Sequence, residues 1–255
     1  MAASNEPRDI CVVSPDTDVY TMLVDLVGND RLPPRHSLTL MTKGKRQSVI
    51  NIRDNVLRLG KQKSKALLGL HNFTGSDWGG KMVGISKDTW IKKFLDLDEN
   101  SPVIKALAFL GEGDIPNTLS GDERPAVLKP LENFTCKGYS DTSTSPDTVP
   151  SLRWHLFRSK NFEGENLPPT RAALLPHIVR VNYICMRDKS YTVNCPNLPP
   201  IEDNCWKLVN GSYMPVMCLE LPAPKAVMEL TKCGCAKGCS SRCSCIRNSL
   251  PCIPL

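Results

Sequence analysis

Residues 9–28 read DICVVSPDTDVYTMLVDLVG, and this stretch determines the fold of the first part of the chain. The β-branched run at 10–14 predicts a buried strand of the kind found in parallel sheets. Residues 15–18 end the strand, and the apolar spacing from Val19 to Val27 predicts a helix that Gly28 closes. We therefore expect an α/β domain that begins with a strand and a helix.

Strand and helix signals continue up to residue 110. A basic turn at Lys43-Gly44-Lys45 separates two strand-like runs and predicts a hairpin. The expected elements are strands at 37–41 and 47–52, a helix at 54–70 broken at Gly60, a glycine-punctuated turn at 71–80, and helices at 87–97 and 96–110.

Composition divides the rest of the chain. Ser, Thr, Asp and Pro are frequent in 136–150, which predicts a loop or linker. Helices are expected at 152–160 and 170–186, the second with Thr170 as its N-cap, and 195–224 has no regular pattern. The expected segments are a first domain at 1–110, a linker or loop at 111–150, a helical and Pro-rich segment at 151–224, and a cysteine-rich tail at 225–255.

Charge and cysteine content bear on compartment and partners. No apolar signal sequence follows the polar start, and no run approaches the roughly 18 apolar residues of a membrane span. We therefore expect a nuclear or cytoplasmic protein, the nucleus being favoured. Thiols stay reduced in these compartments, so the twelve cysteines favour metal binding over disulfide bonds. Eight basic residues and one acid lie between Lys43 and Lys65, which predicts either contact with phosphates or a solvated basic surface.

The tail holds the clearest chemical pattern. Its cysteines follow C-x-C-x3-C-x3-C-x-C-x6-C, and six thiolates can hold two zinc ions when two sulfurs bridge. Because the tail has few apolar side chains, the metal has to supply the folding energy. The alternatives are a disordered cysteine-rich tail and a zinc site without a recognition role. The predicted zinc ligands are Cys233, Cys235, Cys239, Cys243, Cys245 and Cys252.

This spacing resembles one half of a tesmin-like CXC domain, a zinc-thiolate module that binds DNA. The resemblance implies that the tail contacts DNA, and its net charge of +4 from Pro224 onward agrees with that. Where the family carries a tyrosine that enters the minor groove, this chain has Arg242. The residues expected to contact nucleic acid are Lys43, Lys45, Arg46, Lys87, Lys237, Arg242 and Arg247.

Three aspartates form a second candidate site. Asp16 and Asp18 follow the first predicted strand directly, and ligands of open α/β sheets bind beyond the carboxyl ends of strands. Asp77 lies in a Gly-Ser-Asp turn that would converge on the same place, and carboxylate clusters of this kind hold Mg2+ or Mn2+ in phosphodiester hydrolysis. The alternative for the Asp16 and Asp18 pair is a turn or helix cap. His71 is either a ligand or a packing residue.

The order of these motifs resembles the C-terminal half of the nuclease core of flap endonucleases and other PIN-like enzymes, over residues 9–97. The resemblance implies that Asp16, Asp18 and Asp77 stand for metal-binding aspartates, and that residues 83–87 grip a DNA backbone with Ser86 in place of a glycine. The family's remaining carboxylates would lie upstream of Ile10, where this chain has nine residues. We therefore expect an incomplete sheet and an inactive nuclease half-domain.

Most of the chain also resembles uncharacterised invertebrate proteins of the mobile-element type. The motifs that carry this resemblance are the turn from His71 to Asp77, the helix start from Leu167 to Thr170, and Pro222 to Ala226. We expect a nucleic-acid-associated protein, DNA being favoured, with zinc in its tail. The alternatives are an active Mg2+- or Mn2+-dependent nuclease completed by another chain, and a zinc-stabilised interaction protein without nucleic-acid binding. Whether the chain is an enzyme stays open at this point.

Overall fold

The computed structural model describes residues 6–42, 48–115, 125–142, 144–159, 166–220 and Cys243. Residues Met1–Met217 form one compact unit and residues Cys218–Leu255 a second. The described part of the first unit combines helices with small sheets, which confirms the expected α/β class. No helix among the described residues is both long and apolar enough to cross a membrane.

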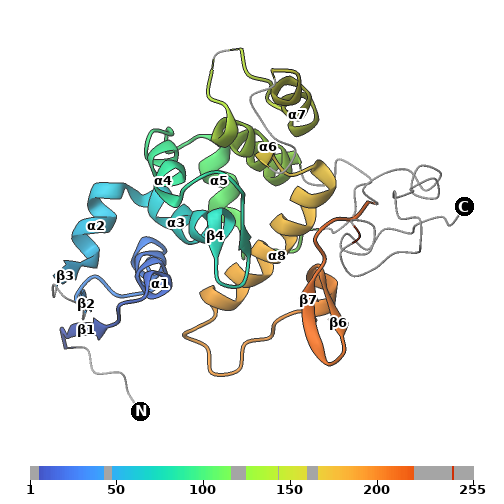
Figure 1. Ribbon diagram of the computed structural model, residues 1–255. Helices are drawn as coiled ribbons and strands as arrows, with labels where there is room; N and C mark the ends of the chain where they lie inside the picture. Colours follow the sequence, from blue (N-terminus) through green and yellow to red (C-terminus); the bar gives the residue numbers. More distant parts are fainter. Residues whose placement is uncertain are drawn as a thin grey trace, which may run out of the picture. The chain divides into compact units, whose positions relative to one another are not determined.

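A three-stranded sheet of order β1-β2-β3 begins the first unit (Figure 1). β1 (Asp9–Val13) pairs in parallel with β2 (Ser37–Thr42), and β2 pairs antiparallel with β3 (Ser48–Asn51). α1 (Thr17–Gly28) connects the two parallel strands, as the crossover between parallel strands requires. The helix buries an apolar stripe against the sheet, composed of Leu23, Val24 and Val27 on α1 and Leu38 and Leu40 on β2.

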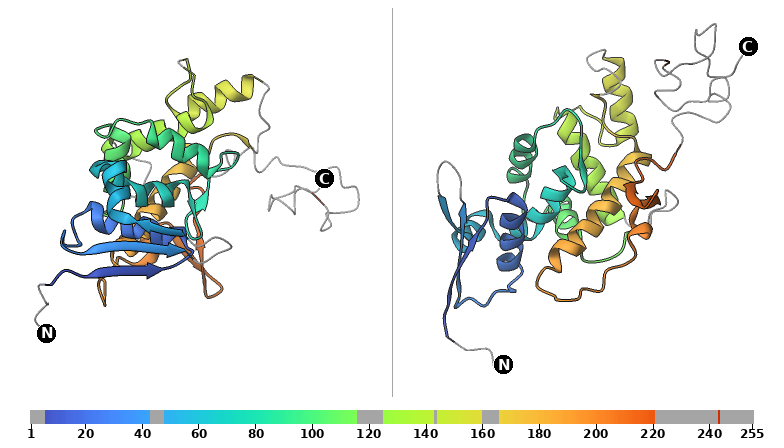
Figure 2. Two further views of the ribbon diagram at one scale, coloured as in Figure 1. Left: turned by 90° about the vertical axis from the view of Figure 1, so that its left-hand side faces the viewer. Right: turned by 60° about the horizontal axis from the view of Figure 1, so that its bottom comes forward.

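β1 is covered on one face only. The prediction of a buried strand at 10–14 is therefore wrong for the other face. Ile10 and Val12 pack into the cluster under α1, whereas Cys11 is exposed and Val13 is 50% exposed. Figure 2 shows the described helices on one side of this sheet. β1 is also an edge strand, with β2 as its partner among the described residues.

Two helices and a hairpin follow the sheet. α2 (Ile52–Leu59) and α3 (Lys61–Thr74) are separated at Gly60, as the sequence predicts, and the φ of +87° at this glycine explains the break. α3 extends to Thr74, so the turn expected from His71 onward is wrong in its first four residues. The hairpin of β4 (Gly75–Ser76) and β5 (Gly80–Lys81) comes after it.

The remaining helices correct the sequence prediction at one place. α4 (Lys87–Leu95) and α5 (Pro102–Phe109) lie within the predicted ranges. The linker expected at 111–150 is wrong in its middle, because α6 (Pro125–Tyr139) lies there. α7 (Val149–Arg158) and α8 (Arg171–Lys189) confirm the last two helices.

The segment at 195–224, for which the sequence predicts no regular pattern, contains short elements. These are the 3-10 helix η2 (Ile201–Asn204) and the antiparallel strands β6 (Trp206–Val209) and β7 (Ser212–Pro215). Cys205 between them has a φ of +60°, which places it in the left-handed region, and the pairing of β6 with β7 turns at Asn210 and Gly211.

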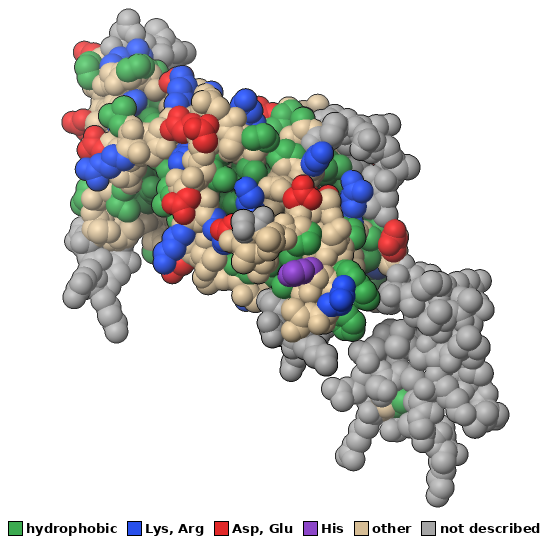
Figure 3. Space-filling model, turned by 90° about the horizontal axis from the view of Figure 1, so that it is seen from above, with side chains coloured by type: hydrophobic (Ala, Val, Ile, Leu, Met, Phe, Trp, Pro, Cys, Tyr) green, Lys and Arg blue, Asp and Glu red, His purple; other side chains and the backbone are tan. Residues whose placement is uncertain are grey.

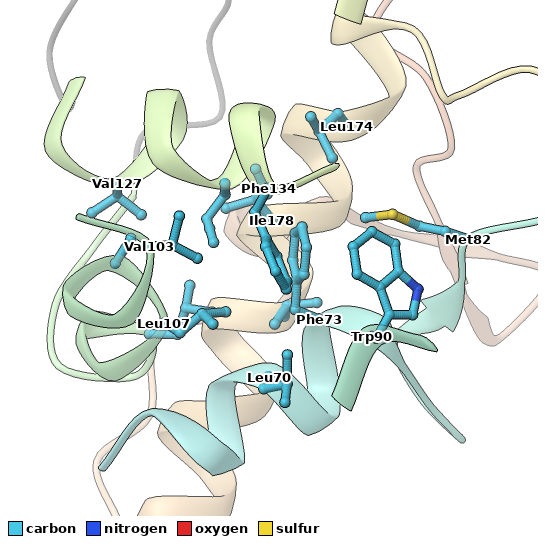
Figure 4. Close-up of a cluster of buried hydrophobic side chains, with 14 of the residues drawn as sticks. Leu70, Phe73, Met82, Trp90, Val103, Leu107, Val127, Phe134, Leu174 and Ile178 are labelled. Carbon is cyan, nitrogen blue, oxygen red and sulfur yellow. The ribbon is translucent and has the colours of Figure 1, made fainter. Parts of the chain in front are cut away.

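An aromatic cluster forms the centre of the larger core (Figure 4). Phe73, Trp90 and Phe134 come from α3, α4 and α6, and all three are fully buried. The rings of Trp90 and Phe134 lie 5.1 Å apart, and Phe73 meets Trp90 edge-on at 6.5 Å. Such pairs contribute about 0.5–1.5 kcal/mol beyond their burial. Trp90 thus packs in the core, whereas Trp78 is 62% exposed.

α3 and α5 approach each other closely at Gly69. A Cβ atom on this residue would lie 2.1 Å from the backbone carbonyl oxygen of Leu107 in α5. A backbone atom cannot rotate away as a side chain can, so the two helices would have to separate. Gly69 therefore sets the distance between α3 and α5.

Gly69→Ala is expected to destabilise the protein, although alanine is the better helix former by about 1 kcal/mol. The overpacking against Leu107 should lower the free energy of unfolding by about 1–3 kcal/mol net, measured by urea denaturation. Gln62→Ala, at an exposed position of the same helix, is the control and should stay within about 0.5 kcal/mol of wild type. A Gly69→Ala protein as stable as wild type would contradict the close approach.

Candidate functional site

The loop after β1 brings two carboxylates to the start of α1. Asp16 is the N-cap of the helix, and its side chain accepts a hydrogen bond of 2.9 Å from the backbone N–H of Asp18. Asp18 lies in the first turn, where the helix dipole favours a negative charge. Asp16 thus has the capping role that the sequence offers as an alternative to metal binding.

The Asp18 carboxylate is paired with a histidine in the last turn of α3. His71, in the last turn of α3, donates from Nε2 to Oδ1 of Asp18 over 2.5 Å. The histidine side chain is 7% exposed and the aspartate side chain 36% exposed. Burial lowers the pKa of His71, Lys87 lowers it further, and Asp18 acts in the opposite direction. His71 is therefore a neutral donor near pH 7.

A lysine lies beside the same carboxylates. Lys87, the first residue of α4, donates from Nζ to the carbonyl oxygen of Gly75 over 2.6 Å. Burial lowers the pKa of Lys87, while the charges of Asp18 and Asp77 raise it. The ammonium group predicted to contact nucleic acid is thus half-buried and lies near two of the chain's own carboxylates.

A further carboxylate, which the sequence analysis does not select, belongs to this place. Asp188, near the end of α8, accepts from the side-chain amide of Asn72 over 3.0 Å and from Nη2 of Arg187 over 2.7 Å. Its charge raises the pKa of His71. A lone aspartate near a helix end carries no sequence signal, because only the packing of α8 against α3 brings it to His71. We call Asp18, His71, Asp77, Lys87 and Asp188 the Asp18 cluster.

The chain's own residues engage the aspartates at this place. Asp18 accepts from His71 and acts electrostatically on Lys87, while the side chain of Asp16 caps its own helix. Among the residues that the structure describes, no group of three or more His, Cys, Asp or Glu side chains is arranged to hold a metal ion. That Asp16, Asp18 and Asp77 bind a common metal ion stays a prediction.

Most of the other predicted site residues lie outside the described residues. Cys243 of the predicted zinc ligands is described, and it is buried. The undescribed ones are the zinc ligands Cys233, Cys235, Cys239, Cys245 and Cys252 and the basic residues Lys43, Lys45, Arg46, Lys237, Arg242 and Arg247.

Several of the described basic residues after position 47 form hydrogen bonds or ion pairs within the protein. Arg53 donates from Nε to the carbonyl of His36 over 2.7 Å, Lys61 pairs with Asp30 at 2.6 Å, and Lys63 donates to the carbonyl of Leu95 over 2.6 Å. Figure 3 shows a face on which Lys and Arg side chains alternate with Asp and Glu side chains.

α7 presents an aromatic face that the sequence analysis misses. Trp154 and Phe157 are 61% and 59% exposed, and their rings stack 6.3 Å apart with an interplanar angle of 26°. The guanidinium of Arg158 lies 6.0 Å from the centre of the Trp154 ring. Val149, Leu152 and Leu156 form the buried stripe of α7. Their helical spacing is the signal in the sequence from which the exposed position of the two aromatic residues could have been predicted.

Comparison of the chain with protein-family models, with curated proteins and with solved structures gives no match. The resemblances to PIN-like nucleases and to CXC domains therefore stay predictions. The chemistry of the chain's own residues has to support any function proposed for it.

The environment of His71 predicts that two substitutions shift the pKa of this histidine in opposite directions. In Asp18→Asn the pKa of His71 should fall further, because the carboxylate that raises it is removed. In Lys87→Met the pKa of His71 should rise, because a neighbouring positive charge is lost. NMR titration of the imidazole signals measures both, since the chain has four histidines.

His36 serves as the internal control in both variants. His36 directly precedes β2. Its pKa is lowered by burial and by Arg35, Arg8 and Arg53, and not by the Asp18 cluster. Shifts of His71 in the same direction in the two variants, or equal shifts of His36, would contradict the arrangement described.

Proposed function

We propose that this is a nuclear, nucleic-acid-associated protein with a PIN-like half-domain that does not cleave its ligand and a cysteine-rich tail that binds zinc. The observation that carries the proposal is the exposed aromatic face of α7, with its stacked pair and the adjacent guanidinium. DNA is the favoured ligand because the tail's cysteine spacing resembles that of a DNA-binding module.

The α7 face has the chemistry of a platform for single-stranded bases. Two exposed aromatic rings offer flat surfaces that any base can stack on, and such stacking contributes about 1–3 kcal/mol per base. Arg158 at the end of the helix supplies a positive charge that can meet a phosphate. Large aromatic side chains are rare in this chain, at 6% of residues, so two of them side by side in solvent call for a partner.

The Asp18 cluster supports the absence of cleavage in this proposal. A two-metal nuclease needs carboxylates that are free to coordinate cations. Asp18 instead accepts a short hydrogen bond from His71, and the Lys87 ammonium lies near both Asp18 and Asp77. Lys87 thus offsets part of the negative charge that would hold Mg2+ or Mn2+, and the hydrogen bond from neutral His71 occupies an oxygen of Asp18.

The tail supplies the second contact in this proposal. Six cysteines within twenty residues match the ligand number of a two-zinc cluster, and five basic residues accompany them. A zinc-folded tail would hold Lys237, Arg242 and Arg247 in a fixed arrangement toward phosphates.

A second candidate function is a nuclease completed by another chain, and the edge of β1 favours it. The strand offers its unpaired backbone groups on the side away from β2, with Val13 half-exposed and the opposite face of the sheet uncovered among the described residues. Strands added at such an edge form backbone hydrogen bonds with it. A partner of this kind would bring further carboxylates next to Asp16 and Asp18.

Binding to labelled single-stranded DNA, followed by fluorescence anisotropy, tests the first proposal. Trp154→Ala with Phe157→Ala should weaken binding at least about ten-fold, because two stacking surfaces are lost. Complete removal of zinc by a chelator should weaken it as well, and the affinity of the intact protein should fall steeply with salt as counterions are released.

Trp78→Ala is the matched control, since Trp78 is equally exposed but lies next to the Asp18 cluster. Its affinity should equal that of wild type. Unchanged affinity in both the α7 variant and the zinc-free protein would refute the proposal and leave a zinc-stabilised interaction protein. Loss of binding in Trp78→Ala alone would move the nucleic-acid contact to the acidic cluster and favour the nuclease.

A further inference from the structure

A cavity of about 220 Å³ lies between the β4–β5 hairpin, α6, α8 and the end of the β6–β7 hairpin. Its wall is mainly apolar, with Met82, Leu174 and Pro215 among its residues. The hydroxyl of Tyr139, which also lines it, is already satisfied by the carbonyl oxygen of Val83 at 2.9 Å. This lining suits an apolar body rather than a sugar or a nucleotide.

One cation in this wall lacks a counter-ion among the residues that the structure describes. Arg180 is 3% exposed, and its Nη1 donates to the carbonyl oxygen of Val216. Its Nε is buried without a hydrogen-bond partner, and no carboxylate among the described residues forms an ion pair with it. Burial of an unpaired charge is costly, so a protein normally pairs such a group.

The neighbours of Arg180 do not supply the missing charge. Cys205 is buried and its pKa is raised by burial, so it is a neutral thiol at neutral pH. His177 donates from Nε2 to the carbonyl oxygen of Phe73 over 2.9 Å, and burial lowers its pKa to about 4, so it is neutral as well. Lys81, the other cation of the lining, is exposed to solvent.

The free edge of the guanidinium specifies the charge that fits. With Nη1 engaged and Nε itself buried, the Nη2 group carries the remaining donors of this guanidinium. A carboxylate can accept from that group, and one negative charge balances one guanidinium. A phosphate dianion would bring more charge and more acceptors than this apolar wall can satisfy.

We infer that this cavity is a binding site for a small monocarboxylate with an apolar body, which pairs with Arg180 and packs its body against Met82 and Leu174. This site is separate from the Asp18 cluster and from the α7 face, so it is independent of the nucleic-acid proposal. The ligand's carboxylate supplies the counter-ion that the described residues do not.

Calorimetric titration of the full-length, zinc-loaded protein tests the inference with phenylacetate and hexanoate, each compared with its neutral amide. Wild type should bind at least one of the two acids at least about ten-fold more tightly than the corresponding amide, because the charge-assisted pair with Arg180 is absent for the amide. Arg180→Met, which keeps the length and removes the charge, should lose this preference. Arg171→Met, at an exposed position of the same helix, should behave like wild type.

A second variant keeps the test valid if Arg180→Met does not fold. Ala173→Leu places extra volume in the cavity from a half-buried position of α8, without breaking the helix, and should abolish binding of acid and amide alike. The inference is overturned if neither acid binds wild type at millimolar concentration, if acid and amide bind equally, or if Ala173→Leu binds as wild type does.

Discussion

Burial of α3 on almost every side is the constraint on which the other parts of the first unit depend. From Ser64 to Thr74 nearly every residue of this helix is buried, and Leu67 packs against both hydrophobic clusters. The missing side chain of Gly69 lets α5 approach to backbone distance. Because α3 is packed between α1 and α5, the position of its last turn is fixed. That position places His71 against Asp18 and Phe73 in the aromatic cluster.

The charges at the end of β1 follow from this packing. A histidine carried by a buried helix end is neutral, and it still offers one N–H to the carboxylate of Asp18. Lys87 is drawn in by α4 and loses part of its hydration, which the fields of Asp18 and Asp77 offset. The result is a cluster in which one ammonium group offsets part of the carboxylate charge and a neutral imidazole occupies an oxygen of Asp18. The metal sites of nucleases need carboxylate oxygens that are free to coordinate cations. The proposed loss of cleavage thus rests on the occupied oxygen of Asp18 and the nearby ammonium group.

The sequence predicted much of the fold but less of the site. The spacing of apolar residues and the positions of glycines and capping residues located α1, the break at Gly60, and the N-cap of α8 at Thr170. These signals are local in the sequence. α6 was hidden by its composition, since Pro130 and the Ser- and Thr-rich residues after Tyr139 indicate a loop. The pairing of Asp18 with His71 spans 53 residues, and the approach of Asp188 to Asn72 spans 116, so neither has a local signal. Arg180 likewise lies in the middle of an ordinary helix pattern. Only the surrounding wall reveals that its charge has no partner among the described residues.

The proposed loss of cleavage at the Asp18 cluster is tested most directly by assaying cleavage of labelled flap and single-stranded DNA in the presence of Mn2+. Wild type is compared with Asp77→Ala, which removes an exposed carboxylate beside Lys87. If the hydrogen bond from His71 occupies Asp18 and Lys87 offsets the charge of Asp18 and Asp77, neither protein cleaves either substrate. Cleavage by wild type that disappears in Asp77→Ala would show that these carboxylates hold catalytic metal ions, and would contradict the proposed loss of nuclease activity.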